Sequence, residues 1–209
     1  RFERKFIIPY EYQYNMVNRI LSNPYKFKEA YEERIINNIY FDDYNLNSLK
    51  DNINGISIRS KYRLRWYGNK YECKKYIFEK KYKKGNVGNK TFFEIKDFNF
   101  TKNSNQTSIK SEIEKKCTSY FLKQSIKHFN PVLLNSYKRR YFSSNDKKVR
   151  ITLDYEIENY KINNISHFKI PNYNKNNKMI MEIKYENNLL IDISTICKYF
   201  PFRQQRFSK

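Results

Sequence analysis

Apolar and charged positions alternate through residues 57–68, Ser-Ile-Arg-Ser-Lys-Tyr-Arg-Leu-Arg-Trp-Tyr-Gly. Because successive side chains of a β-strand point to opposite faces, this spacing predicts a strand with one cationic face and one apolar face. The cationic face carries Arg59, Lys61, Arg63 and Arg65, and the apolar face carries Ile58, Tyr62, Leu64 and Trp66. Like charges about 7 Å apart along one face repel one another. The pattern therefore fits either a basic, solvated edge or a surface that binds an anion.

Similar alternation predicts further strands along the chain. Their ranges are 1–8, 35–41, 77–83, 90–96, 132–142, 149–155 and 179–185. Apolar residues at helical spacing predict helices at 10–22, 46–51 and 189–199, and one or two helices within 109–129. Residues 159–177 are rich in Asn and fit neither pattern. No low-complexity linker divides the chain, so the sequence predicts a single domain over residues 1–209.

Charge points to an anionic partner. The chain of 209 residues carries 42 Lys and Arg against 21 Asp and Glu, a formal net charge of +21. Such an excess favours binding to nucleic acid, polyphosphate, nucleotides or an anionic membrane surface. Net charge alone does not choose among these partners.

Cysteine usage and hydropathy indicate a compartment. Cys73, Cys117 and Cys197 are far apart and odd in number, which favours a reducing, cytoplasmic setting over a disulfide framework or a zinc site. No run approaches the ~18 apolar residues of a membrane span. Because the chain begins at Arg1, we expect it to be a domain of a longer protein. A membrane anchor elsewhere in that protein would place the domain at the cytosolic face of a membrane.

Motifs for several common chemistries are missing from the sequence. There is no G-x-x-x-x-G-K-[ST] or G-x-G-x-x-G loop, and the chain has only 4 Gly residues with which to build a phosphate-binding nest. His128 and His167 lie far apart, and no set of residues suggests a Ser/His/Asp or Cys/His nucleophile. If the protein binds phosphate, its side chains must therefore do so.

A Glu-x-Lys motif recurs within the predicted strands. The pairs are Glu3/Lys5, Glu79/Lys81, Glu94/Lys96 and Glu182/Lys184. One such pair would be interpreted as a weak surface ion pair. Together with Arg139, Arg150 and the cationic face of residues 57–68, they favour a barrel with a charged interior and an apolar exterior covered by helices. Such an interior suits a linear polyanion, and its carboxylates could hold a divalent cation.

Seven segments, in order, resemble one known family. They are Arg1–Phe6, Asn38–Asp42, Tyr62–Gly68, Tyr137–Phe142, Val149–Asp154, Met181–Tyr185 and Phe207–Lys209. Together they are similar to the polyphosphate polymerase domain of the vacuolar transporter chaperone (VTC) type, within the CYTH-like triphosphate tunnel metalloenzymes. The resemblance implies an α+β, mainly β fold: a closed, eight-stranded antiparallel β-barrel, or tunnel, with helices packed outside.

The resemblance also implies an activity: a phosphotransferase that moves the γ-phosphoryl group of ATP onto inorganic polyphosphate and releases ADP. The catalytic residues it implies are Lys5, Arg63, Arg65, Lys81, Arg139, Arg150, Lys184 and Lys209. It implies Arg59, Lys61 and Lys90 as cofactor-binding residues and Glu182 as the ligand of Mn²⁺ or Mg²⁺. Lys96 competes with Lys81 for the position of the middle tunnel lysine. The parent protein is expected to form homo- or hetero-oligomers.

Other functions remain open on the sequence alone. The same tunnel could serve a non-catalytic polyphosphate or nucleotide sensor, an inorganic triphosphatase or a relative of nucleotide cyclases. A basic nucleic-acid-binding module is a further alternative, since Tyr and Arg interleave as in base-stacking platforms. The cations, however, lie in phase on strands, so no nucleic-acid partner is expected.

Overall fold

The computed structural model describes residues 2–71, 73, 75–85, 87–117, 119–170, 178–186 and 193–205. Its strands are β1 (Phe2–Pro9), β2 (Lys28–Asp42), β3 (Ile58–Tyr67), β4 (Lys75–Lys84), β5 (Val87–Lys96), β6 (Asn130–Ser143), β7 (Val149–Ile162), β8 (His167–Lys169) and β9 (Lys178–Tyr185). Its helices are the 3₁₀ turn η1 (Tyr10–Tyr12), α1 (Gln13–Leu21), α2 (Asn47–Ile53), α3 (Gln106–Lys116), α4 (Tyr120–Lys127) and α5 (Ile193–Lys198). The predicted mainly β, antiparallel fold is confirmed.

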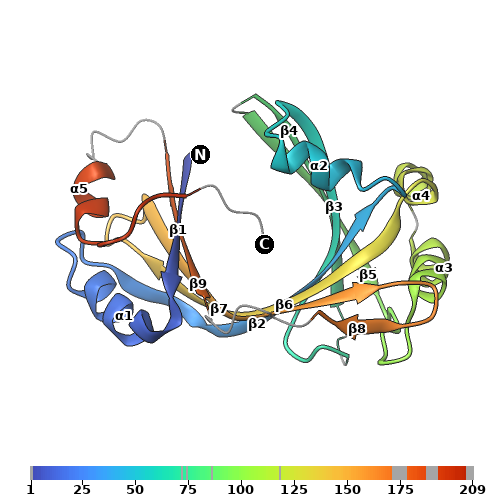
Figure 1. Cartoon of the computed structure of the whole chain (residues 1–209), viewed down its shortest axis with the longest axis horizontal. Helices are drawn as coiled ribbons and strands as arrows, with labels where there is room; N and C mark the ends of the chain where they lie inside the picture. Colours follow the sequence, from blue (N-terminus) through green and yellow to red (C-terminus); the bar gives the residue numbers. More distant parts are fainter. Residues whose placement is uncertain are drawn as a thin grey trace. The chain divides into compact units, whose positions relative to one another are not determined.

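The strands follow the order β1-β9-β7-β6-β2-β3-β4-β5, with β8 paired to β7 (Figure 1). The pairs β1–β9, β7–β9, β7–β8, β2–β3, β3–β4 and β4–β5 are all antiparallel. Closure of this sheet into a barrel stays a prediction. Among the described residues, no helix is long and apolar enough to cross a membrane.

The chain divides into two compact units. Unit 1 comprises residues 1–34, 137–157 and 172–209, and unit 2 comprises residues 35–136 and 158–171. Strands β2, β6 and β7 contribute residues to both units. Each unit has its own hydrophobic core, and a single domain over residues 1–209 stays a prediction.

The core of unit 1 lies between its strands and two helices. Alternate residues of β7 and β9, among them Ile151, Leu153 and Met181, pack in one cluster with Ile20 of α1 and Ile196 of α5. Figure 1 shows α1 and α5 on the same side of these strands. Because side chains alternate between the two faces of a strand, the polar residues of β7 and β9 lie on the opposite face.

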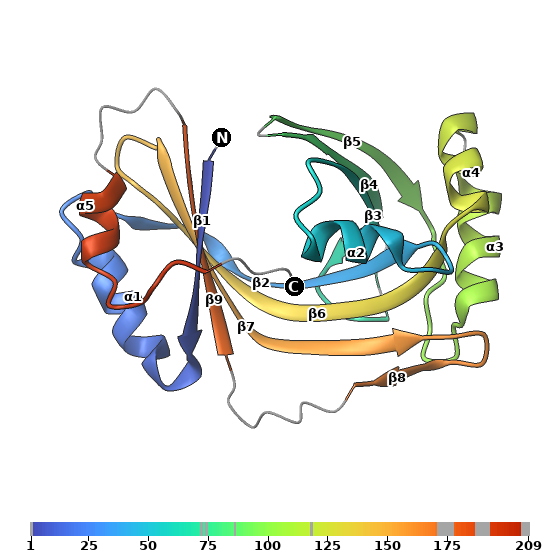
Figure 2. The ribbon, with the colours of Figure 1, turned by 45° about the horizontal axis from the view of Figure 1, so that its top comes forward.

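The core of unit 2 is aromatic. Trp66 of β3 packs at 5.0 Å, between ring centroids, from Tyr76 of β4 and at 5.4 Å from Phe100. Figure 2 shows α3 and α4 side by side against this sheet, and α3 inserts Ile109 and Ile113 into the same core. Helix α3 begins with a capping box, in which the Asn105 side chain accepts a hydrogen bond from the Ser108 backbone N–H.

Strand β2 is longer than the sequence predicted. It begins at Lys28 rather than at residue 35, and its first half is exposed on both faces. Alternation of apolar and polar residues is therefore absent there, because neither face needs to be apolar. Side chains support this half instead: Glu29 pairs with Arg140, and the Tyr31 ring lies 5.6 Å from the Tyr141 ring.

Strand β7 is also longer than predicted, because its alternation changes phase. Ile151 and Leu153 pack in the core of unit 1, whereas Tyr160 and Ile162 pack against the core of unit 2. Between them Glu156 has φ 51°, a left-handed backbone conformation that is unusual for a residue other than glycine. This irregularity inverts the faces of the strand, as a β-bulge does. The inverted pattern explains why the sequence predicted a strand only to residue 155.

Candidate phosphate-binding site

The cationic face predicted for residues 57–68 is present in unit 2. Tyr62, Leu64 and Trp66 of β3 are buried in the core, so Arg63 and Arg65 project from the other face. The antiparallel register places Arg63 opposite Glu79 of β4. The same register places Lys61 opposite Lys81, which in turn lies opposite Lys90 of β5. Strand pairing thus brings lysines from three strands together on one face.

Glu79 organises this face of unit 2. Its side chain is only 3% exposed, and its Oε2 lies 2.5 Å from both Nε and an Nη atom of Arg63. Arg65 lies 3.9 Å away, and the ammonium group of Lys90 also pairs with the carboxylate. Burial alone would raise the pKa of Glu79, but the charges of Arg63 and Arg65, with hydrogen bonds from Lys90 and Arg63, hold that pKa below its ordinary value. Glu79 is therefore an anion that fixes the neighbouring cations.

Asn38 fixes the second arginine. Its side-chain Oδ1 accepts a hydrogen bond of 2.9 Å from Nε of Arg65. Asn38 is fully buried, and its Nδ2 atom has no hydrogen-bond partner in the described part of the chain. The asparagine therefore orients the guanidinium group of Arg65.

The two candidates for the middle lysine lie in different surroundings. Lys81 lies opposite Lys61 and Lys90, within the cluster of cations. Lys96 lies opposite Lys75, and the Glu94 of its motif forms an exposed ion pair of 2.8 Å with the same Lys75. These positions favour Lys81, and its role stays a prediction.

Unit 1 carries a second cationic face. Lys5 of β1 lies opposite Glu182 of β9, and Arg150 of β7 lies opposite Lys184. The Glu182 carboxylate is 3.7 Å from Lys5 and 3.2 Å from Lys184. Glu3 adds a second acid, 3.0 Å from Lys5. The structure thus brings the predicted residues Lys5, Arg150, Glu182 and Lys184 together on one face of β1, β9 and β7.

Arg139 is fixed by a partner that the sequence analysis missed. Its Nε and Nη2 atoms donate hydrogen bonds of 2.5 and 2.7 Å to the two oxygens of Asp154, whose side chain is fully buried. Nη2 also lies 3.8 Å from Glu182. A bidentate pair of this kind fixes the plane of the guanidinium group. The signal was present in the sequence, since Arg150, Thr152 and Asp154 alternate in phase.

A divalent cation fits the surroundings of Glu182. The neighbouring residue in the register is Thr152, whose buried Oγ1 has no hydrogen-bond partner in the described part of the chain. Among the described residues, no group of three or more His, Cys, Asp and Glu side chains could hold a metal by itself. Mg²⁺ and similar ions are commonly held by one or two carboxylates together with substrate phosphates. One carboxylate beside an unsatisfied hydroxyl meets that requirement.

The comparison with known families agrees with this geometry. The family described as the VTC domain matches residues 1–209 of the sequence. The chain belongs to the VTC domain family. No curated protein matches the chain.

Solved structures share the fold at low sequence identity. One is a protein from Pyrococcus horikoshii OT3, with a TM-score of 0.50, 14% identity, and coverage of 99% of this chain and 95% of the other. A candidate adenylate cyclase from Vibrio parahaemolyticus has a TM-score of 0.52, 10% identity, and coverage of 100% and 95%. A candidate adenylyl cyclase from Hippeastrum, described as having a dominant triphosphatase activity, has a TM-score of 0.52, 14% identity, and coverage of 99% and 91%.

Three residues considered in the sequence analysis of this VTC domain lie outside the two groups of paired cations or outside the described residues. Lys209 lies outside the described residues, so its role stays a prediction. Arg59 lies on the cationic face of β3 but donates a hydrogen bond of 2.5 Å to the backbone oxygen of Ile56. His128 is an exposed residue between α4 and β6.

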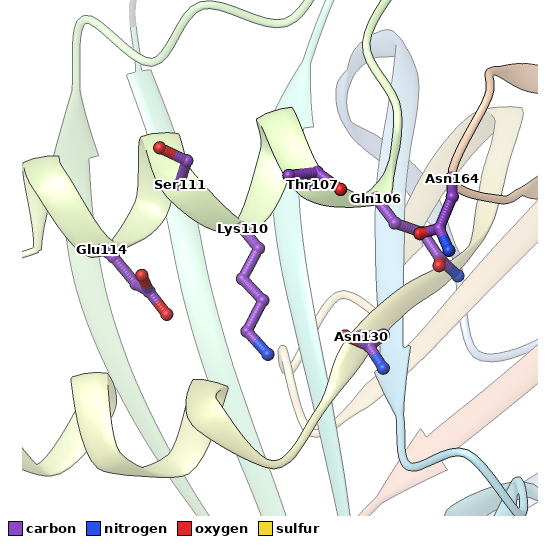
Figure 3. Close-up of a pocket in the computed structure, with 7 residues that line it drawn as sticks. All are labelled: Gln106, Thr107, Lys110, Ser111, Glu114, Asn130 and Asn164. Atoms are coloured by element: carbon purple, nitrogen blue, oxygen red, sulfur yellow. The ribbon is translucent and has the colours of Figure 1, made fainter.

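Unit 2 also has a cavity of about 230 Å³. Figure 3 shows the residues that line it, which come from α3, the start of β6 and the turn before β8. Its lining residues are Gln106, Thr107, Lys110, Ser111, Glu114, Asn130 and Asn164. The Lys110 ammonium group donates a hydrogen bond of 2.9 Å to the backbone oxygen of Lys127. None of the predicted site residues lines this cavity.

Proposed function

We propose that this VTC domain is an ATP-dependent polyphosphate polymerase whose two cationic faces bind phosphate. The observation that carries the proposal is the pairing of cations directly across strands, Lys61 with Lys81 in unit 2 and Arg150 with Lys184 in unit 1. Like charges in such positions destabilise a sheet. A bound polyanion would lower the repulsion that remains between these cations, which supports the same proposed role for both faces.

The arginines are already oriented by protein partners, which suits them to bind phosphate as well. Glu79 and Asn38 hold Arg63 and Arg65 in place, and Asp154 holds Arg139. A guanidinium group that is already oriented loses less entropy when it binds phosphate oxygens in a bidentate manner. The lysines then act as point charges along the phosphate chain. Since the sequence has few glycines, these side chains replace a backbone nest.

Glu182 is the proposed ligand of Mn²⁺ or Mg²⁺, and Thr152 is the nearest unsatisfied hydroxyl. When bound, the metal would neutralise charge on phosphate oxygens. Lys5 and Lys184, both within 3.7 Å of the Glu182 carboxylate, would hold the phosphate groups beside it. Arg139, 3.8 Å from the same carboxylate, would orient a further phosphate oxygen.

The proposed reaction needs no protein nucleophile. A terminal oxygen of the polyphosphate chain attacks the γ-phosphorus of ATP, and the bond from that phosphorus to the bridging oxygen breaks. ADP leaves with the electron pair of that bond, and the chain grows by one phosphate. Phosphoryl transfer of this kind depends on positioning and charge neutralisation. The cationic faces supply both.

A triphosphatase is the second candidate, favoured by the activity named for the structural neighbour from Hippeastrum. It would use the same cations with water as the nucleophile. A binding domain without turnover, acting as a polyphosphate sensor, would also retain the cations. The three functions differ in their products.

The test is incubation of the domain with ATP and Mn²⁺, followed by measurement of ADP, free phosphate and phosphate chains resolved by electrophoresis. Chains that appear with ADP support the polymerase. Free phosphate without chains identifies the triphosphatase, and tight binding without either product identifies the sensor. The variant R63A/R65A is expected to lose the products, whereas K115A/K116A, with the same loss of charge on α3, serves as the matched control.

A further inference from the structure

A second group of lysines lies in the turn between β6 and β7 of unit 1. A small cavity there is lined by Lys147, Lys148, Arg150, Lys184, Tyr185 and Glu186. Arg150 and Lys184 belong to the cationic face already described, whereas the sequence analysis assigned no role to Lys147 and Lys148. The cavity therefore joins two lysines of a loop to that cationic face.

The turn is held by its own hydrogen bonds. The Ser144 hydroxyl donates to Asp146 at 2.5 Å and accepts from the backbone N–H of Val149 at 3.0 Å. Asp146 in turn accepts from the backbone N–H of Lys148 at 3.1 Å. The hydrogen bond from Ser144 keeps the pKa of Asp146 below its ordinary value, so this acid is ionised at neutral pH. Its negative charge is used to hold the turn.

The two lysines are presented to solvent by this rigid turn. Lys147 and Lys148 are both exposed, and Lys147 has φ 60°, which directs the chain sharply back into β7. Within the described residues, neither ammonium group forms an ion pair with an acidic side chain. Asp146 and Glu186 lie beside them, but the cavity lining still holds four cations, Lys147, Lys148, Arg150 and Lys184, against one acid, Glu186, so it is suited to bind an anion.

The cavity continues the row of charges along β7 and β9. Arg150 and Lys184 lie opposite each other, and the next pair on the same face is Thr152 with Glu182. Tyr185 stacks on Phe2, with ring centroids 5.9 Å apart, so this ring is already packed and offers no platform for a base. The surroundings suit phosphate groups without a nucleoside.

We propose that Lys147 and Lys148 extend the phosphate-binding face of unit 1 and bind the polyphosphate chain beyond the phosphates held by Arg150 and Lys184. The inference rests on the proposed function and adds a chain-length dependence to it. A short ligand occupies the strand cations alone. A longer chain reaches the turn and gains the two additional ionic contacts.

The test compares the affinity of the domain for tripolyphosphate and for chains of many phosphates, measured by calorimetry. K147Q/K148Q removes the charges and keeps side-chain length, K147R/K148R keeps the charges, and K115Q/K116Q is the control on α3. We expect K147Q/K148Q to weaken long-chain binding on the order of tenfold, as two partly exposed ionic contacts allow, with a smaller effect on tripolyphosphate. K147R/K148R is expected to retain the long-chain affinity.

Two results would overturn the inference: equal losses of affinity for both phosphate ligands, or the same loss of long-chain affinity in K115Q/K116Q. Failure of the proposed function would give a different result from failure of this inference. If the unmodified domain binds long polyphosphate and makes chains while K147Q/K148Q matches it, only the role of the turn is wrong. If the unmodified domain binds neither phosphate ligand, the proposed function itself is wrong.

Discussion

Two buried carboxylates, Glu79 in unit 2 and Glu182 in unit 1, lie among cations but differ in their contacts. Glu79 is 3% exposed and lies 2.5 Å from Arg63. Glu182 is 8% exposed, and its ion pairs with Lys5, Arg139 and Lys184 measure 3.2–3.8 Å. Glu182 also lies beside the unsatisfied hydroxyl of Thr152. Glu79 therefore has the closer arginine contact, and Glu182, the proposed metal ligand, has the longer ion pairs.

The largest expected effect is on stability and concerns Asp154, the buried partner of Arg139. Asp154→Asn removes the bidentate charge partner of the buried Arg139 guanidinium and leaves it the longer contact with Glu182 at 3.8 Å, which should lower the free energy of unfolding by about 3 kcal/mol. Urea denaturation measures this loss. Glu156→Gln breaks the exposed ion pair between Glu156 of β7 and Lys138 of β6 and should cost at most about 1 kcal/mol. Equal losses of unfolding free energy in the two variants would contradict the expectation that the buried ion pair stabilises the protein more than the exposed one.

The next effect separates the two carboxylates directly. Glu182→Gln should weaken Mn²⁺ binding in the presence of tripolyphosphate by about 100-fold, because the proposed ligand is lost. Glu79→Gln should leave the Mn²⁺ affinity within a fewfold of the unmodified value while it weakens the binding of tripolyphosphate. Titration calorimetry with each ligand in turn measures both. The assignment is wrong if Glu79→Gln weakens Mn²⁺ binding as much as Glu182→Gln does.

The pH dependence of stability tests Glu79. Its pKa is lowered in the folded protein, so the stabilisation it provides is fully present above the ordinary glutamate pKa of 4.5 and is lost as the pH falls through the lower folded value. The difference in unfolding free energy between the unmodified protein and Glu79→Gln should therefore shrink below pH 4.5. Chemical denaturation from pH 7 to pH 3 measures it. A difference that stays constant would exclude an ionised, paired Glu79.

The smallest effect concerns the bulge in β7. Glu156→Ala and Glu156→Gly both remove the ion pair with Lys138, so they differ only in backbone preference. Because φ is 51° at this position, the Gly variant should be more stable than the Ala variant by about 1 kcal/mol. Thermal unfolding compares them. A more stable Ala variant would contradict the left-handed conformation.

The sequence predicted the fold best where each strand has one apolar face. In β3, Tyr62, Leu64 and Trp66 alternate with cations, and both the strand and its two faces are observed. The first half of β2 was missed because both of its faces are exposed. The end of β7 was missed because Glu156 inverts the phase of alternation. A glutamate in the sequence does not indicate that its backbone is left-handed.

The candidate site was predicted as a set of cations without their partners. Periodicity placed Arg63 and Arg65 on one face, but their contacts with Glu79 and Asn38 depend on the register between strands. The bidentate pair of Arg139 with Asp154 joins two strands in the same way. Register arises from pairing over long sequence separations, and a period of two within one strand does not encode it.

The most direct test of the central claim is the affinity for tripolyphosphate of variants in each unit separately. R63A/R65A removes the arginines of unit 2, and R150A/K184A removes two cations of unit 1. Each double variant, folded as judged by circular dichroism, is expected to bind tripolyphosphate at least roughly tenfold more weakly than K115A/K116A. If either variant binds as tightly as that control, phosphate is not held by both cationic faces.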